Sequence, residues 1–201
     1  MSARMPHPLQ CRCGTLKGFV ADVRSTHRAL CYCKDCQAFA HFLKRPAEIL
    51  DARGGSDVIQ TQQKNVTFTQ GTEALACMRL TDRGLLRWYA ACCNTPIGNT
   101  LPSFKLSFVG LVHSCLANPN QSLQDSFGAV RAVVNTQGAV GTPKPESRGA
   151  LATIGWALAL IARARFNGSY KQTPFFRADG TPIATPRLLS GEERTQLRNA
   201  V

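Results

Sequence analysis

The feature that most constrains this chain is its cysteine spacing, because closely spaced thiols limit both the local turns and the chemistry. Seven of the nine cysteines lie in three short clusters. In a chain without an export signal, such clusters are typical of metal sites rather than disulfides. The first residues carry no apolar run of the export type, so we expect a cytoplasmic protein with free thiols. The clusters are Cys11-x-Cys13, Cys31-x-Cys33-x-x-Cys36 and Cys92-Cys93.

The middle cluster predicts an open metal site. Alternate residues of an extended chain point the same way, so Cys31 and Cys33 can face one ion, and a turn can add Cys36. Thiolate ligands favour zinc. Three protein ligands leave a tetrahedral ion one position short, which distinguishes a catalytic zinc from a structural one. We therefore expect Cys31, Cys33 and Cys36 to form a catalytic zinc site that binds a substrate thiol as its thiolate.

The first and third clusters predict a second, structural zinc. Cys11 and Cys13 supply two ligands, and Cys93 is the favoured third. Neighbours in an extended chain diverge, so Cys92 can join the same ion only if the chain turns there. The alternative fourth ligand is Cys77, on the preceding strand of an expected hairpin. The expected cofactor is thus Zn²⁺, with two ions per chain.

Charge and hydropathy narrow the possible partners. The chain has 24 Lys and Arg against 12 Asp and Glu, a net charge of +12 that favours anionic partners. These basic residues are scattered, with no run of five, which argues against a dedicated nucleic-acid-binding face. The longest apolar run, 151–162, is interrupted and too short to cross a bilayer, so we expect no membrane partner.

The apolar pattern predicts a mainly β fold of short strands. The clearest element is a hairpin of residues 75–80 and 85–91 around a turn that contains Asp82 and Gly84. We expect residues 1–116 to form a zinc-binding β domain and residues 117–201 a C-terminal helical extension. The extension has an expected linker at about 136–149, a helix at about 150–165 and a helix start at Ser190. Further strands are expected at 16–23, 48–52, 57–61, 66–69, 105–115 and 129–134.

The order Cys-x-Cys-Gly, Cys-x-Cys-x-x-Cys-Gln and a final turn ending in Cys-x-x-Pro resembles the glutathione-dependent formaldehyde-activating enzyme family. That family includes the centromere protein V group. The likeness covers roughly Cys11 to Gly98, and its most specific part is Cys31 to Gln37. It implies a zinc-stabilised β-tent fold of short strands, shared with methionine-R-sulfoxide reductases.

The resemblance also implies roles for the cysteines, with one departure. The family's last pair is Cys-x-x-Cys-Gly, and its first cysteine falls here on Ala90, while Asn94 replaces the glycine. Asn tolerates the left-handed conformation that such a turn can need. The matching ligands are Cys31, Cys33 and Cys36 for the catalytic zinc and Cys11, Cys13 and Cys93 for the structural zinc.

Two functions follow as expectations. The first is a carbon–sulfur lyase or adduct-forming zinc enzyme, whose partners are a small thiol such as glutathione and a small aldehyde. The second is a non-enzymatic module, stapled by zinc, that binds a protein or a nucleic acid. The fourth position at Cys31, Cys33 and Cys36 distinguishes them: a fourth protein ligand, such as His27 or His113, would favour the module.

Overall fold

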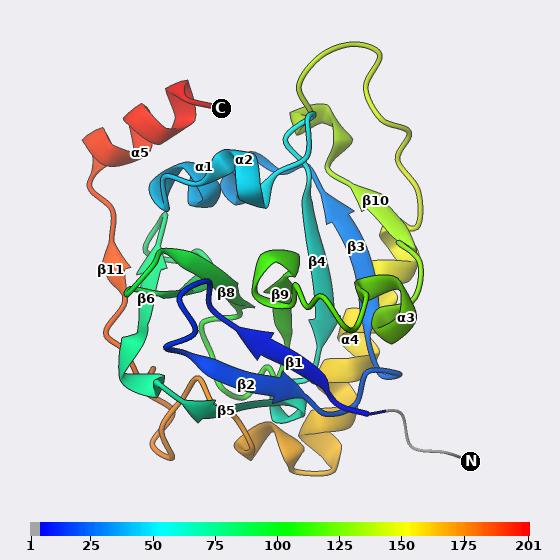
Figure 1. Ribbon diagram of the computed structural model, residues 1–201, viewed down its shortest axis with the longest axis vertical. Coiled ribbons are helices and arrows are strands. Elements are labelled where there is room, and N and C mark those ends of the chain that lie inside the picture. Colours follow the sequence, from blue (N-terminus) through cyan, green and yellow to red (C-terminus); the bar gives the residue numbers. More distant parts are fainter. Residues whose placement is uncertain (1–4) are drawn as a thin grey trace.

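The computed structural model describes residues 5–201, and over that range the protein is mostly β, with eleven strands in two sheets and five α-helices (Figure 1). The predicted mainly β fold with a C-terminal helical extension is confirmed. The strands are β1 (His7–Gln10), β2 (Lys17–Val20), β3 (His27–Cys31), β4 (Ser56–Thr61), β5 (Val66–Gln70), β6 (Leu75–Arg79), β7 (Leu86–Ala90), β8 (Thr95–Thr100), β9 (Val109–Val112), β10 (Ala132–Val134) and β11 (Arg187–Leu188). The helices are α1 (Lys34–Phe42), α2 (Pro46–Ile49), α3 (Leu123–Phe127), α4 (Ala150–Phe166) and α5 (Gly191–Asn199).

The strands form one small and one large sheet. The small sheet has the order β1-β2-β5 and is antiparallel. The large sheet has the order β10-β3-β4-β9-β8-β7-β6-β11. Its inner pairs are antiparallel, whereas β10 on β3 and β11 on β6 are parallel. The expected hairpin is present as β6 and β7, with Cys77 opposite Trp88.

Each face of the large sheet carries an apolar cluster. On one face, Leu9 and Leu16 of the small-sheet segment pack with Trp88 and Ile97 of the large sheet. On the other face, the helical segment from α1 to α2 packs on β6 and β9, with Phe39 fully buried at its centre. The large sheet therefore lies between the small sheet and the segment from α1 to α2.

The expected strand at 48–52 is wrong. Pro46 begins the short helix α2, which ends at Ile49. Proline fixes a helical φ and its missing N–H costs nothing at the first helical position, so a helix can start there. Ile49 is buried against the α1 side of the core, and Asp51 and Gly55 then close a turn.

Two further expectations concern the second half of the chain. Only Val109–Val112 of the expected strand 105–115 is extended, because a turn closed by the Leu106 N–H and the Ser103 carbonyl comes before it and a 3-10 turn follows at His113–Cys115. Helix α5 begins as expected, since Ser190 and Glu193 form a reciprocal capping box.

No α-helix in residues 5–201 is long and apolar enough to cross a bilayer. The expected division into a β domain of residues 1–116 and an extension of residues 117–201 stays a prediction.

The C-terminal half contributes to the main core. Phe175 is fully buried, and its ring lies 5.2 Å from that of Trp88 and 5.6 Å from that of Phe68. Aromatic pairs at these separations add to the free energy gained by burial. The residues after α4 thus cover the core that the hairpin and the small sheet form.

We expect Phe175→Ala to lower the free energy of unfolding by about 3–5 kcal/mol, the usual cost of emptying a buried aromatic site. Urea denaturation of the metal-loaded protein measures this. The matched control is Phe166→Ala, because the Phe166 side chain is 91 % exposed and its loss should change the stability by less than about 0.5 kcal/mol. Equal losses in both variants would contradict the role of Phe175 in the core.

Candidate metal centres

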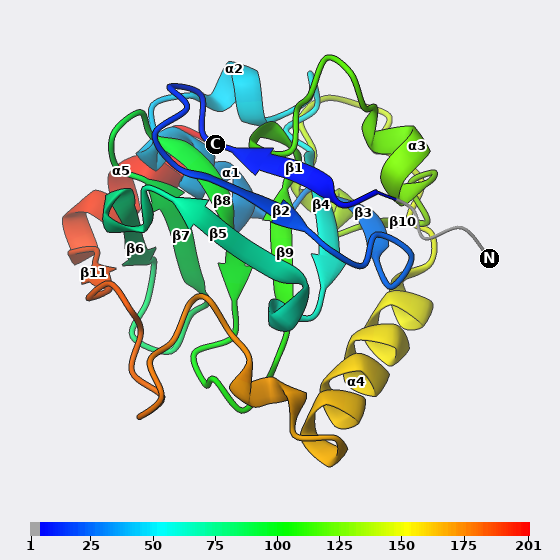
Figure 2. The same ribbon diagram turned by 60° about the horizontal axis from the view of Figure 1, so that its bottom comes forward.

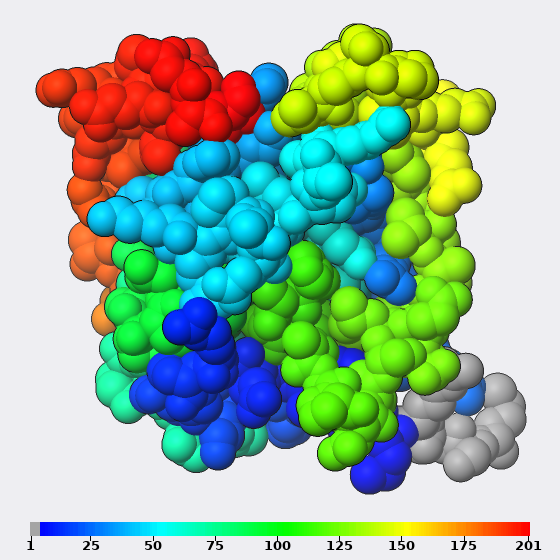
Figure 3. All heavy atoms as spheres, turned by 45° about the horizontal axis from the view of Figure 1, so that its top comes forward, coloured from blue at the N-terminus to red at the C-terminus, as the bar shows by residue number. Residues whose placement is uncertain are grey.

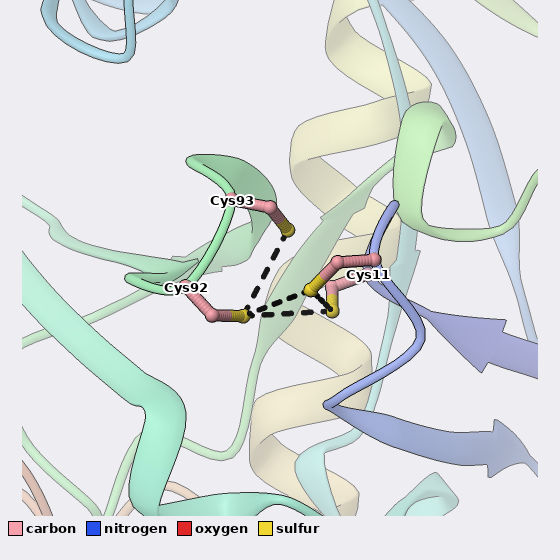
Figure 4. Close-up of side chains that lie close together, drawn as sticks. Cys11, Cys92 and Cys93 are labelled. Carbon is pink, nitrogen blue, oxygen red and sulfur yellow. Dashed lines mark hydrogen bonds between the residues drawn. The ribbon is translucent and has the colours of Figure 1, made fainter.

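Two turns that are distant in the sequence bring four sulfur atoms together. Cys11 and Cys13 lie in the turn between β1 and β2, and Cys92 and Cys93 lie in the turn between β7 and β8. All four Sγ atoms lie within 4.8 Å of one another. The two turns face each other, with Cys11 pointing toward Cys92 and Cys93 (Figure 4). The group therefore contains both adjacent cysteines, whereas Cys77 lies outside it.

The spacing of these sulfurs fits a tetrahedral ion. Zinc–sulfur bonds of about 2.3 Å in a tetrahedron place the sulfurs about 3.8 Å apart. The Sγ atoms of Cys11 and Cys92 are 3.8 Å apart, as are those of Cys92 and Cys93. The Sγ atom of Cys13 lies 3.5 Å from that of Cys11 and 3.3 Å from that of Cys92. This four-sulfur group can hold a metal ion, and its donor set is the type that structural zinc prefers.

A left-handed residue explains how neighbouring cysteines converge. Asn94 has φ 54°, a conformation that asparagine tolerates better than most residues. The turn is closed by a hydrogen bond from the Cys93 N–H to the Ala90 carbonyl at 3.3 Å. The Arg12 N–H also donates to the Thr95 hydroxyl at 3.0 Å, which ties the two cysteine turns together.

The surroundings of the Cys11 and Cys13 thiols shift their pKa values in opposite directions. The Thr15 hydroxyl and main chain hold the pKa of the exposed Cys13 thiol down, at about 6. Burial acts in the opposite direction on Cys11 and raises its pKa. The Leu16 N–H donates to the Cys11 sulfur at 3.3 Å, an interaction that favours a thiolate. The group thus mixes an exposed, easily ionised thiol with a buried one.

The second group forms where β3 meets α1. Cys31 ends β3, and Cys33 and Cys36 lie at the start of α1, so a single short segment supplies all three sulfurs. The three Sγ atoms lie within 4.8 Å of one another, and each residue is half-buried. Cys33 is the N-cap of α1, and its sulfur accepts the Cys36 N–H at 3.3 Å. Helix N-termini favour thiolates because their N–H groups and dipole are positive.

The three thiols influence one another. Hydrogen bonds from the Cys33 and Cys36 thiols lower the pKa of Cys31 strongly. The same contacts raise the pKa of Cys36, and burial raises it further. One thiolate is thus favoured in the metal-free group, and a divalent cation would favour ionisation of all three.

Residues far along the chain support this group. The Asn135 side chain donates its Nδ2–H to the Cys31 sulfur at 3.3 Å. Buried Gln37 donates to the Tyr32 and Gly138 carbonyls, both at 2.9 Å. Gly138 lies so close that a Cβ there would be 2.1 Å from the Tyr32 oxygen. The sequence indicated Gln37 through its motif, but Asn135 and Gly138 fell in or beside an expected linker and carried no signal of their own.

No fourth protein ligand joins Cys31, Cys33 and Cys36 among the described residues that can bind metals. His27 instead bonds the Thr153 hydroxyl through Nε2, at 2.9 Å, and burial lowers its pKa. His113 is also outside the group. With three protein ligands, a tetrahedral ion keeps one coordination position open for a water molecule or a substrate.

Fold and site together define a mainly β protein with one four-cysteine and one three-cysteine group, both suited to a metal such as zinc. A model described as a family of unknown function (DUF6151) matches residues 1–184, so the chain belongs to that family. Among curated proteins no match is found. Among solved structures, a Rhodobacter sphaeroides protein is 16 % identical over 56 % of this chain and 92 % of its own. Its TM-score against this chain is 0.37.

We expect Cys92→Ser to lower the zinc content from about two ions per chain to about one, because it removes one of four ligands from the first group. Elemental analysis after dialysis against a weak chelator measures this. The matched control is Cys77→Ser, since the Cys77 thiol is buried and lies outside both groups, so both ions should stay. Loss of an ion from the Cys77 variant alone would contradict the proposed ligand set.

Proposed function

We propose that this protein is a zinc-dependent enzyme that forms or breaks a carbon–sulfur bond between a small, acidic thiol such as glutathione and a small aldehyde. The observation that carries the proposal is the group of three cysteines, with no fourth described ligand, at the start of α1. The resemblance of Cys31 to Gln37 to the glutathione-dependent formaldehyde-activating enzymes supports the same reaction class. Cys31, Cys33 and Cys36 would hold the zinc.

Zinc bound there would supply a mild Lewis acid of net charge −1 with its three thiolates, which suits binding of a sulfur nucleophile better than activation of water. The chain's own residues orient the ligands. Asn135 holds the Cys31 sulfur through its amide, and Gln37 fixes the backbone at Tyr32 between the first two ligands. Such outer contacts set the direction of metal ligands and hence of the open position.

In the forward reaction, the sulfur of the bound thiol forms a bond with the carbonyl carbon of the aldehyde. The π electrons of the C=O bond move to the oxygen, which takes the proton that the thiol gave up on ionisation. Holding the two reactants together supplies much of the rate enhancement. The reverse reaction breaks the same carbon–sulfur bond.

A positively charged hollow beside α1 supports an acidic substrate, although none of the three cysteines lines it. Its volume is about 380 Å³, and its wall includes Lys34 and Asp35, which lie between Cys33 and Cys36 in the sequence. Arg194 and Arg198 of α5 add two further cations. Three cations against one carboxylate favour a ligand that carries carboxylates. Figure 3 shows α5 and the segment 136–149 as separate lobes on either side of the surface that α1 and α2 form.

The alternative is a non-enzymatic, zinc-stapled module that binds another macromolecule. One observation favours it: α4 exposes a set of large apolar side chains that a protein partner could cover. Leu151 is 85 % exposed and Leu158 62 % exposed, and Ile154 between them is also exposed. Such a module needs no open position at the three-cysteine group.

We expect glutathione to change the near-ultraviolet absorption of the cobalt-substituted protein, because a new sulfur–cobalt bond adds charge-transfer intensity there. The variant Cys33→Ser should bind one ion fewer and lose this change, while its fold is kept. The matched control Cys115→Ser, at a buried cysteine outside both groups, should respond like the wild type. If glutathione binds the wild type and Cys33→Ser alike, the proposed contact between sulfur and metal is wrong.

A further inference from the structure

A second hollow lies at the opposite end of β3 from the three-cysteine group. It is bounded by α4, by the segment 22–25 between β2 and β3, and by the segment 62–65 between β4 and β5. Its volume is about 380 Å³, within the range of sites for small ligands. Figure 2 shows α4 running beside the loop that joins β2 to β3. Neither the proposed zinc chemistry nor the family description uses this hollow.

The wall of this hollow is positively charged. Arg24, Lys64 and Arg163 contribute cations from three separate segments, and Asp22 contributes the one carboxylate. The excess of two positive charges matches a ligand that carries about two negative charges. Phosphate monoesters have this charge near neutral pH, and arginine is well suited to their geometry.

The same wall offers a flat aromatic surface. Trp156 lines the hollow and is half-buried. Its ring packs on His27, with the ring centroids 5.4 Å apart and the planes 30° apart. Leu160, one turn further along α4, adds a buried apolar contact. A ring held in this way is a stacking platform for a planar heterocycle.

The floor is built from two buried amides. Gln62 and Asn65 are each 6 % exposed. The Gln62 Nε2 donates to the Leu160 carbonyl at 3.0 Å, and the Asn65 Nδ2 donates to the Thr61 hydroxyl at 2.8 Å. The first of these bonds joins the floor directly to α4. A site whose side chains are already ordered in this way costs less conformational entropy when a ligand binds.

We propose that this hollow is a binding site for a nucleoside monophosphate. The base stacks on Trp156, and the phosphate lies among Arg24, Lys64 and Arg163. A bare phosphate would leave the aromatic surface uncovered, and an uncharged nucleoside would gain nothing from the cations. Both halves of the ligand are therefore needed for full affinity.

Titration calorimetry on the full-length, zinc-loaded protein tests the proposal with three probes: AMP, adenosine and inorganic phosphate. We expect AMP to bind at least about tenfold more tightly than either of the others, and to weaken as the salt concentration rises. AMP should also quench tryptophan fluorescence, because Trp156 lines the hollow while Trp88 is fully buried. Failure of AMP to bind, or equal binding of AMP and phosphate, would overturn the proposal.

Two pairs of variants locate the site. Arg163→Gln should weaken AMP binding about tenfold by removing a charged contact to the phosphate. Arg165→Gln is its control on the same helix, because the Arg165 guanidinium lies over the Tyr170 ring at 4.7 Å, outside the wall. Trp156→Leu should lose the stacking contact, whereas Trp156→Phe keeps an aromatic ring.

Circular dichroism and zinc content of each variant show whether it is folded. Equal AMP affinity in Arg163→Gln and wild type, or equal losses in Arg163→Gln and Arg165→Gln, would place binding elsewhere and overturn the assignment. None of the substituted residues belongs to either cysteine group, so the outcome is independent of the chemistry proposed for Cys31, Cys33 and Cys36.

Discussion

In the four-cysteine group, four pairs of sulfur atoms are 3.3–3.8 Å apart, and thiolates at this separation repel one another unless a shared cation lies between them. This constraint bears on the whole architecture, because Cys11 and Cys13 follow a strand of the small sheet whereas Cys92 and Cys93 follow a strand of the large sheet. A cation in that group would therefore fasten one sheet to the other. The apolar core between the sheets is then formed by segments whose ends are already tied together.

The local elements were predictable where the sequence itself contains the physical cause. The hairpin of β6 and β7 follows from alternating apolar residues and a turn with Gly84. Helix α2 was missed because the apolar residues around Ile49 fit a short strand as well as a helix, and Pro46 decided between them. The three-cysteine group was evident from spacing alone. Its partner Asn135 was not, because 104 residues separate it from Cys31 and only the fold brings them together.

The strand β3 connects the three-cysteine group with the hollow beside α4. His27, at its start, supports the ring of Trp156, and Cys31, at its end, carries a sulfur of the three-cysteine group. A five-residue strand spans only about 13 Å between its end residues. Residues from the C-terminal half complete both ends, since α4 covers the first and Asn135 contacts the second. Residues after 117, which were expected to form a separate extension, therefore contribute to each end of β3.

The outermost strands of the large sheet are β10, beside β3, and β11, beside β6, and both come after residue 131 in the sequence. A sheet whose lateral N–H and C=O groups are unpaired can recruit strands from other molecules and aggregate. In the finished sheet one edge is β11, with two residues, whereas without it the edge would be β6, with five. A short edge strand is a poorer template for pairing than a long one, so loss of β11 would leave a longer edge to which strands of other molecules can add.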